Sequence, residues 1–422
     1  MERVVITGVG AVTPFGKKSK NFFEGIRAGK SALRKLTLFQ DAALECQVAA
    51  EIPEFNPLDY LPSVEIKRVP RVVPMALGAC REALEDSGLP WENPDENTRR
   101  GMGIVIGTGG GGIEFAEKQY EEFFVSKSRK VTPYCVSSSF VGMLSSEVSI
   151  ALGLKGISHV LSTGCTSSTD AMGYAYQMIR TGQEKILITG GAESCITPGL
   201  MAGFCRMGVL ATRYNEAPEK ASRPFDRERD GFILGEGAWM FVMESYQAAK
   251  ARGAKIYAEI LGYASTCDAY HRVAAKQDGI EPARAMSLTL ERAGLVAKDV
   301  ESVQLHGTAT KMNDAVETRA LKIAFGKTAG AVSATALKSM IGHPQGACGA
   351  AGVMAALFSL NEQFIPPTIN YENLDPECDL DYTPNRGVSR KVNRVLCNTI
   401  AFGSKNSALL LGRVSAEENF IG

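Results

Sequence analysis

The chain has 422 residues, enough for two or three units at about 100–200 residues per domain. Apolar residues make up 45% and charged residues 22%, which is ordinary for a globular protein and excludes a wholly disordered, collagen-like or coiled-coil chain. The 46 basic and 46 acidic residues give a formal net charge of zero, without the basic excess that nucleic-acid-binding proteins usually carry.

The N-terminus and the cysteines bear on the cellular location. Residues 1–5 lead directly into a strand-like run, without the basic and apolar segments of a secretory signal. No apolar run approaches the roughly 18 residues needed to cross a bilayer. No two of the 10 cysteines form a closely spaced pair, so they are expected to be reduced thiols. The sequence therefore predicts a cytoplasmic protein without a membrane span.

Strand-like and helix-like segments alternate along the chain. In the first part we expect strands at residues 4–7, 103–106, 159–163 and 185–189, and helices at residues 73–84 and 171–179, ended by Gly88 and Gly182. In the second part we expect strands at residues 302–306, 332–335, 395–401 and 408–411, and helices at residues 314–325 and 345–360. This alternation predicts an α/β fold with mostly parallel sheets.

The expected helix at residues 345–360 is apolar nearly all round and rich in Gly and Ala. Such a helix belongs in an interior, which favours a layered protein with helices buried between two sheets. A weak boundary falls near residues 250–255, where a polar helix end leads into a new strand. Units of strand, reactive residue and helix occur in both parts and give a faint sign of duplication.

The glycine run at residues 107–112, GTGGGG, follows an expected strand and matches the opening of a dinucleotide-binding fingerprint. No acidic residue ends a second strand about 20 residues later, as that fingerprint requires. The alternatives are a tightly packed or flexible glycine loop and a loop that lines a substrate channel.

Cys165 lies in STGCTSS, residues 162–168, where an expected strand turns into a helix. The unpaired N–H groups and the dipole at a helix N-terminus favour the nucleophilic thiolate over the thiol. Backbone N–H groups at such a turn can also hold an oxyanion. The alternative is a buried cysteine with a structural role.

Two of the four histidines, His306 and His343, occupy glycine-flanked ends of expected strands. The carboxyl ends of parallel strands meet at one edge of a sheet, where active sites of α/β proteins assemble. The histidines lack the close ligand spacing of a zinc site, so no metal is expected. His159 precedes a strand and is expected to be structural.

These motifs resemble the β-ketoacyl-acyl carrier protein synthases, condensing enzymes with the thiolase fold. The resemblance rests on Cys165 in STGCTSS, His306 in LHGTATKMNDAVET, and Lys338 with His343 in LKSMIGHPQGACGAAG, and it covers about residues 3–412. It implies a five-layer αβαβα fold built from two similar halves. Residues 1–253 would carry the nucleophile, and residues 254–422 would carry the two catalytic histidines.

The resemblance also implies roles for the site residues. Cys165 would accept an acyl chain from a carrier-protein thioester, and malonyl on a second carrier would lose CO2 and attack that thioester. His306 and His343 would hydrogen-bond the malonyl thioester carbonyl as it becomes an enolate, and Lys338 would pair with Glu317. The backbone N–H groups of Cys165 and Phe402 would form the oxyanion hole.

Phe402 also matches the family's gate, a ring that moves when the cysteine is acylated. Where the family usually reads GFGG, this chain has AFGS at residues 401–404, followed by Lys405. Because glycine reaches dihedral angles that other residues resist, Ala401 and Ser404 bear on how the gate moves. Lys405 is either a surface charge or a contact for the carrier or its phosphopantetheine phosphate.

Partners follow from the same resemblance. Gly110 and Gly111 lie where homologous elongation enzymes often carry bulky residues that limit the acyl pocket, so tolerance of a long or rigid chain is expected. No metal or organic cofactor is needed, because the phosphopantetheine arm travels on the acyl carrier protein. The expected assembly is a homodimer or a heterodimer with a chain-length-factor-like subunit. Basic residues at the family's carrier-docking positions are Lys67, Arg68, Arg71, Arg129 and Lys130.

Several phrases of the sequence favour the ketosynthase α subunit of a type II polyketide or polyene system, with a fatty-acid elongation synthase as the alternative. A non-catalytic chain-length factor would lack the nucleophile that Cys165 supplies. A thiolase would carry a second catalytic cysteine near its C-terminus, and none of Cys348, Cys378 and Cys397 lies in that motif's context.

Overall fold

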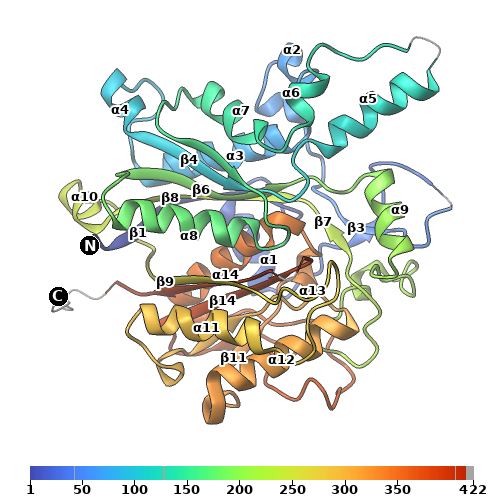
Figure 1. The fold of residues 1–422 in the computed structure, drawn as a ribbon, viewed down its shortest axis with the longest axis vertical. Coiled ribbons are helices and arrows are strands. Elements are labelled where there is room, and N and C mark those ends of the chain that lie inside the picture. Colours follow the sequence, from blue (N-terminus) through green and yellow to red (C-terminus); the bar gives the residue numbers. More distant parts are fainter. Residues whose placement is uncertain (42, 127–128, 404, 415–422) are drawn as a thin grey trace.

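The computed structural model describes residues 1–41, 43–126, 129–403 and 405–414, so Ser404 lies outside the described residues. Ten strands form one hydrogen-bonded sheet in the order β11-β10-β14-β15-β9-β1-β8-β6-β4-β5. The sheet folds into two stacked parts, which are joined where the start of β1 pairs with β9 (Figure 1).

The first part contains β1 (Val4–Val12), β4 (Met102–Gly107), β5 (Ser158–Leu161), β6 (Ile186–Glu193) and β8 (Gly237–Ser245). Strand β4 runs parallel to both β5 and β6, and β8 runs antiparallel to both β6 and β1.

The second part contains β9 (Ala258–Cys267), β10 (Ser302–Gln304), β11 (Ser333–Thr335), β14 (Arg394–Ala401) and β15 (Lys405–Gly412). Here β10 runs parallel to both β11 and β14, and β15 runs antiparallel to both β14 and β9. The order β9-β15-β14-β10-β11 repeats the order β1-β8-β6-β4-β5, so the two parts have the same topology.

The helices complete five layers. Helices α3 (Val72–Ser87) and α7 (Met143–Leu152) cover the outer face of the first part, and α11 (Ile280–Arg292) and α12 (Lys311–Phe325) cover the second part (Figure 1). Helices α8 (Ser167–Arg180) and α14 (Cys348–Glu362) lie between the two sheets and contact strands of both. The expected αβαβα arrangement with buried middle helices is confirmed.

The remaining elements are short or peripheral. The helices are α1 (Ser19–Arg27), α2 (Ser63–Ile66), α4 (Glu96–Arg100), α5 (Ile113–Val125), α6 (Cys135–Ser139), α9 (Pro198–Arg206), α10 (Tyr246–Ala251) and α13 (Lys338–Ile341). The strands are β2 (Arg34–Lys35), β3 (Val48–Ala50), β7 (Leu234–Gly235), β12 (Phe364–Ile365) and β13 (Val388–Ser389).

Local sequence explains several boundaries. Gly88 ends α3 in the left-handed conformation with a φ of 68°, as expected for a glycine cap. Strand β1 continues beyond the expected residues 4–7, through Gly8 and Gly10. A Cβ atom on Gly10 would lie 2.0 Å from the carbonyl oxygen of Ala79, so this glycine lets α3 pack closely on the strand.

The middle helix α14 starts at Cys348, three residues later than expected, because Gln345–Ala347 forms a separate 3-10 turn, η5. No helix within the described ranges is long and apolar enough to cross a membrane.

Candidate active site

Cys165 occupies a sharp turn between β5 and α8. Gly164 has a φ of 74°, a left-handed conformation that glycine adopts at little cost. The Ser167 hydroxyl donates to the Gly164 carbonyl oxygen at 2.5 Å and accepts from the Thr163 N–H at 2.9 Å. The turn therefore holds the thiol, which is 6% exposed, at the start of a buried helix.

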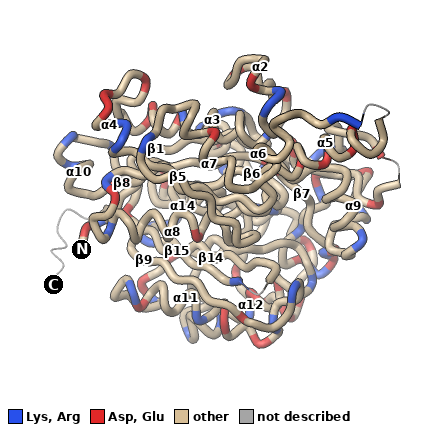
Figure 2. Tube along the Cα trace, turned by 45° about the horizontal axis from the view of Figure 1, so that its top comes forward, with Lys and Arg blue, Asp and Glu red and all other residues tan. Residues whose placement is uncertain are grey.

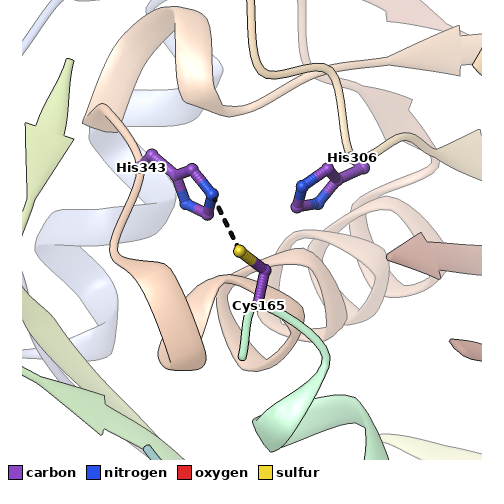
Figure 3. Close-up of side chains that lie close together, drawn as sticks. All are labelled: Cys165, His306 and His343. Carbon is purple, nitrogen blue, oxygen red and sulfur yellow. Dashed lines mark hydrogen bonds between the residues drawn. The ribbon is translucent and has the colours of Figure 1, made fainter. Parts of the chain in front are cut away.

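The two expected histidines lie beside this thiol (Figure 3). His343 Nε2 is 3.3 Å from Cys165 Sγ, and the His306 and His343 rings meet edge to face with centroids 5.3 Å apart. His306 follows β10, and His343 lies between α13 and η5. Three segments that are far apart in the sequence thus place one thiol and two imidazoles in contact, and both histidine placements match the prediction.

Lys338 contacts His306 directly. Its Nζ donates to the His306 carbonyl oxygen at 2.5 Å and lies 3.3 Å from His306 Nδ1. Because an ammonium group only donates, Nδ1 accepts and the ring proton resides on Nε2. Lys338 therefore fixes the tautomer that turns an N–H donor away from the lysine.

Both imidazoles are neutral at pH 7. Burial and the positive charge of Lys338 hold the pKa of His343 well below its usual range. Burial, Lys338 and the neighbouring His343 hold the pKa of His306 well below its usual range in the same way. Neutral imidazoles with fixed N–H groups can stabilise a developing enolate oxygen.

Glu317 supports the His306 loop rather than Lys338. Its carboxylate accepts from the backbone N–H groups of His306 and Gly307 at 2.6 and 2.7 Å, and from Asn398 Nδ2 at 2.6 Å. Burial raises the pKa of Glu317 to about 7, although these three hydrogen bonds oppose the rise. No ion pair joins Glu317 to Lys338 within the described ranges, so the predicted direct pair is wrong.

The protonation state of Cys165 also differs from expectation. Burial raises the pKa of the thiol, and Cys348 adds to this rise. Lys338 and a hydrogen bond from the Phe402 backbone N–H oppose it. The helix N-terminus was expected to favour the thiolate, but desolvation is the larger effect and favours the thiol form of Cys165.

The contact from the Phe402 N–H has a second consequence. An N–H group directed at Cys165 Sγ is close to where the carbonyl oxygen of a Cys165 thioester would lie. This placement suits the oxyanion hole predicted for Cys165 and Phe402.

Ala401 packs against both Cys165 and Cys348. The alanine that stands in place of the first gate glycine therefore lies next to the nucleophile.

The same three side chains could also ligate a metal ion, which the spacing argument did not foresee. The ligand atoms of Cys165, His306 and His343 lie within 4.8 Å of one another. This is a donor set that Zn²⁺ accepts, but the ammonium group of Lys338 adds positive charge next to His306.

A cavity of about 290 Å³ opens in front of the thiol. The catalytic side chains and apolar groups such as Phe232, Ile400 and Phe402 line its floor. Thr308 and Thr310 add hydroxyl groups to the wall. The mouth carries three exposed apolar side chains, Met207, Val273 and Met312, which are 43%, 38% and 43% exposed. A mostly apolar cavity that leads to the thiol suits the arm of a carried substrate.

The glycine run forms a loop whose N–H groups are already bound. Glu193, which is fully buried, accepts from Gly109 N at 2.6 Å, Gly110 N at 3.1 Å and Gly346 N at 3.0 Å. These donors are not available to a phosphate, which argues against the dinucleotide interpretation and favours the packed loop.

Neither Gly110 nor Gly111 lines the cavity in front of Cys165. A Cβ atom on Gly110 would lie 2.9 Å from Cys195 Sγ and 3.1 Å from Ile113 Cγ2, so these side chains fill the room expected there. Gly111 has a φ of 51°, and a Cβ atom on it would lie 2.8 Å from Val141 Cα. Their part in an acyl pocket stays a prediction.

The expected docking residues differ in environment. Lys67, Arg129 and Lys130 are exposed, and basic segments after α2 and after α5 lie on the same side of the molecule (Figure 2). Arg68 pairs with Glu65 at 2.7 Å and is half-buried.

Arg71 does not fit a docking role. Its guanidinium binds both oxygens of Glu236, at 2.9 and 2.8 Å, and Glu236 is 1% exposed. This bidentate pair holds α3 against the core, so the structure gives Arg71 a structural role instead.

Sequence reasoning missed four groups around the thiol. Cys348 Sγ donates to the Cys165 carbonyl oxygen at 3.2 Å, and Gln345 Oε1 lies 3.9 Å from Cys165 Sγ. Glu193 anchors the glycine loop, and His271 lines the cavity. Of these four groups, only Cys348 and Gln345 have a signal in the sequence, because they follow His343 closely. His159 is exposed on β5 and contributes nothing to the site.

Comparisons with known proteins agree with this geometry. Residues 1–249 match the family model of the beta-ketoacyl synthase N-terminal domain, and residues 257–372 match that of the C-terminal domain. The chain is 38% identical to 3-oxoacyl-(acyl-carrier-protein) synthase 2 of Synechocystis sp., with 97% of each chain covered. It is 39% identical to the synthase of the same name from Coxiella burnetii, covering 98% of this chain and 99% of the relative.

Solved structures give the same result. A type II polyketide ketosynthase in complex with its acyl-carrier protein and bound to a hexaketide matches with a TM-score of 0.89 and 30% identity. The ishigamide ketosynthase/chain length factor matches with a TM-score of 0.88 and 34% identity. In both cases the match covers 98% of this chain and 100% of the other. The protein, a condensing enzyme of the acyltransferase type with a Cys-His-His centre, belongs to the beta-ketoacyl synthase family.

Proposed function

We propose that the chain elongates a Cys165-bound acyl group by decarboxylative condensation with malonyl-acyl carrier protein, in the assembly of a polyketide or polyene. The observation that carries the proposal is the 3.3 Å contact between Cys165 Sγ and His343 Nε2, with neutral His306 beside it. A nucleophile next to a base, and a second fixed donor at the same point, are what the two half-reactions need.

In the first half-reaction, the Cys165 thiol attacks the acyl thioester of a carrier protein. His343 Nε2 takes the thiol proton and returns it to the departing carrier thiolate, so that an acyl-cysteine and a free carrier thiol remain. The backbone N–H of Phe402, with that of Cys165, stabilises the oxyanion that forms between these states.

In the second half-reaction, malonyl-carrier protein enters through the apolar cavity and loses CO2. His306 donates its Nε2 proton to the thioester oxygen, which takes up the negative charge as an enolate, and His343 donates to the same oxygen once its own ring proton lies on Nε2 instead of Nδ1. The enolate carbon attacks the acyl carbon, the carbon–sulfur bond to Cys165 breaks, and Cys165 leaves as a thiolate that takes up a proton from the solvent. The product is a 3-oxoacyl chain on the carrier. No metal or organic cofactor takes part in either step.

The direct test is intact-mass spectrometry of the wild type and Cys165→Ala after incubation with acyl- and malonyl-carrier proteins. We expect an acyl adduct on the wild type only, together with a carrier-bound 3-oxoacyl product. An adduct that survives in Cys165→Ala would place the nucleophile elsewhere, and an active wild type that yields no 3-oxoacyl product would contradict condensation.

Fatty-acid elongation is the second candidate, because the Synechocystis and Coxiella relatives are named 3-oxoacyl-(acyl-carrier-protein) synthase 2. The two ketosynthase structures support polyketide duty, since one is bound to a hexaketide. Successive rounds of malonyl addition without any reducing enzyme separate the two roles. A polyketide synthase carries its unreduced product into further rounds, whereas a fatty-acid synthase stops after one.

A thiolase-like reaction would need a second catalytic cysteine, and Cys348 lies next to the site. Burial raises the pKa of Cys348, and its thiol donates to a backbone carbonyl. A buried thiol in such a position is inert. Because Cys348→Ala removes only one weak hydrogen bond, its condensation rate should stay within about threefold of the wild-type rate. Loss of all activity would favour the thiolase-like alternative.

We also propose that the acyl carrier protein is the partner in catalysis and that the enzyme acts as a dimer built on β5. This strand is one of the two edges of the ten-stranded sheet, and its residues are exposed or half-buried. An unpaired edge readily accepts another strand. Ile150, on the neighbouring helix α7, is 77% exposed. Light scattering of the wild type and Ile150→Glu, alone and with a chain-length-factor-like subunit, distinguishes a homodimer from a heterodimer.

All 10 cysteines are free, which supports a reducing compartment such as the cytoplasm for this reaction.

A further inference from the structure

Gln345 is a buried glutamine beside the nucleophile. It is 8% exposed and begins the turn η5, with a φ of 35° that side-chain-bearing residues rarely adopt. Its Oε1 lies 3.9 Å from Cys165 Sγ. Its Nε2 is buried and has no hydrogen-bond partner among the described residues.

An unpartnered amide donor is costly in a protein interior. Most buried polar groups find a partner, so a buried group without one requires an explanation. The left-handed backbone of Gln345 adds strain at the same residue, and strain of this kind gathers at functional sites. An apolar side chain here would avoid the unpaired amide, so the amide is best explained by an acceptor that arrives with the substrate.

Gln345 does not line the cavity described above, although Cys165, His306 and His343 all do. The next residue, Gly346, donates to Glu193, which also holds Gly109 and Gly110. Gln345 therefore lies next to the glycine loop. With the carrier arm in the cavity, an acyl chain on this side would take the place of the Cys195 and Ile113 side chains that pack around Gly110.

We propose that Gln345 is a specificity-determining residue, whose Nε2 donates a hydrogen bond to an oxygen on the third carbon of the chain held by Cys165. The inference rests on the proposed function, because it requires an acyl group on that sulfur. An amide carries its nitrogen about 2 Å from its oxygen. Oε1 lies 3.9 Å from Cys165 Sγ. Nε2 can therefore be about as far from Sγ as the first carbons of an acyl chain beyond its thioester carbon.

The consequence is a preference for 3-oxoacyl chains over saturated chains of equal length. A saturated chain would leave the amide donor unpaired in a closed site, and sites built to hydrogen-bond an oxygen reject analogues that lack it. This is the discrimination that a synthase needs when its own unreduced product returns as the next acyl donor.

The experiment compares acylation of Cys165 by 3-oxobutanoyl- and butanoyl-carrier protein, followed by intact-mass spectrometry to give kcat/KM for each. The wild type should prefer the 3-oxo chain by about tenfold, the effect of one neutral hydrogen bond. Gln345→Met has a side chain of similar length without a donor, and it should bring the ratio close to one.

Gln304→Met is the matched control. Gln304 is 2% exposed, and both atoms of its amide also lack partners, but it lies on β10 and does not contact Cys165. The same substitution there should leave the substrate ratio unchanged, even if the absolute rate moves.

Equal rates for the two thioesters in the wild type, or an unchanged ratio in Gln345→Met, would overturn the inference while leaving condensation intact. Failure of the wild type to be acylated by either thioester would instead contradict the proposed function. If Gln345→Met does not fold, as judged by circular dichroism, Gln345→Asn retains an amide one carbon shorter and should show an intermediate ratio. The wild-type ratio alone already decides against the inference if it equals one.

Discussion

Lys338 and Glu317 act on the two sides of one peptide segment, that of His306. The lysine ammonium holds the His306 carbonyl oxygen at 2.5 Å, and the Glu317 carboxylate holds the His306 N–H at 2.6 Å. The two side chains therefore hold the backbone that carries the imidazole from opposite sides, without touching each other. Both orient His306, and only Lys338 also contacts its ring.

Replacing Lys338 with methionine should change the pH profile of malonyl decarboxylation. In the wild type both imidazole pKa values lie well below 6.5, so protonation of the histidines causes no loss of rate between pH 6 and 8. Without the lysine charge the pKa of His306 rises, and the acid limb of the profile moves to higher pH. Loss of the fixed tautomer should also lower the rate on the order of 10²-fold.

Lys338→Arg is the control for this experiment, because it keeps the positive charge and should keep the acid limb of the wild type. Coincident profiles for the wild type and Lys338→Met would show that the lysine does not set the charge state of His306.

Replacing Glu317 with glutamine should affect stability in a pH-dependent way. The pKa of Glu317 is raised from 4.5 in the unfolded chain to about 7 in the folded protein. Its contribution to stability is therefore complete below pH 4.5 and is lost as the pH rises to about 7. Chemical denaturation measures the difference in free energy of unfolding between the wild type and Glu317→Gln. This difference should fall between pH 4.5 and about 7 and stay level at higher pH.

Above pH 7, where the wild-type carboxylate is ionised, the same variant leaves one of the two backbone N–H groups without an acceptor, which should cost about 1–3 kcal/mol. Because the loop carries His306, kcat should fall more than KM rises. A constant difference in stability from pH 4 to 8 would show that Glu317 does not titrate in this range.

The sequence predicts most elements because their signals are local. Gly88 and Gly182 mark helix ends, and the all-round apolar pattern of residues 345–360 correctly predicts a helix between two layers, although the helix itself begins at Cys348. The repeated topology is only faintly visible in the sequence, because equivalent turns of the two parts carry different reactive residues. The turn after β5 presents Cys165, whereas the turn before α14 presents His343 and Gln345.

The missed site residues depend on contacts between the two halves, which no local pattern encodes. Glu193 ends β6 in the first half and holds Gly346 of the second half. Gln345 and Cys348 reach Cys165 only because α14 packs against α8. Desolvation at this interface also explains why the helix N-terminus does not produce the expected thiolate.

Charge reversal should separate the docking residues from the structural arginine. Arg129→Glu with Lys130→Glu changes only exposed side chains, so the melting temperature should stay constant while the Kd for an acidic acyl carrier protein rises at low salt.

Arg71→Ala leaves Glu236 buried without its cation, and we expect a loss of about 2–4 kcal/mol of stability. Calorimetry of binding and of unfolding measures both effects. An unchanged Kd for the double variant would rule out this docking surface.

The last prediction concerns chain length and the packing at Gly110. A side chain at Gly110 would meet Cys195 Sγ at 2.9 Å, so Gly110→Ile must displace Cys195 or project toward the acyl side of the site. We expect its longest product to be shorter than that of the wild type, because added volume in a packed region has no other outlet. Gly110→Ile combined with Cys195→Ala removes the clashing sulfur and should recover part of the length. Product profiling by mass spectrometry measures each variant against Cys195→Ala alone, whose product should be no shorter than the wild-type product. If Gly110→Ile gives the wild-type product, this loop does not bound the acyl pocket.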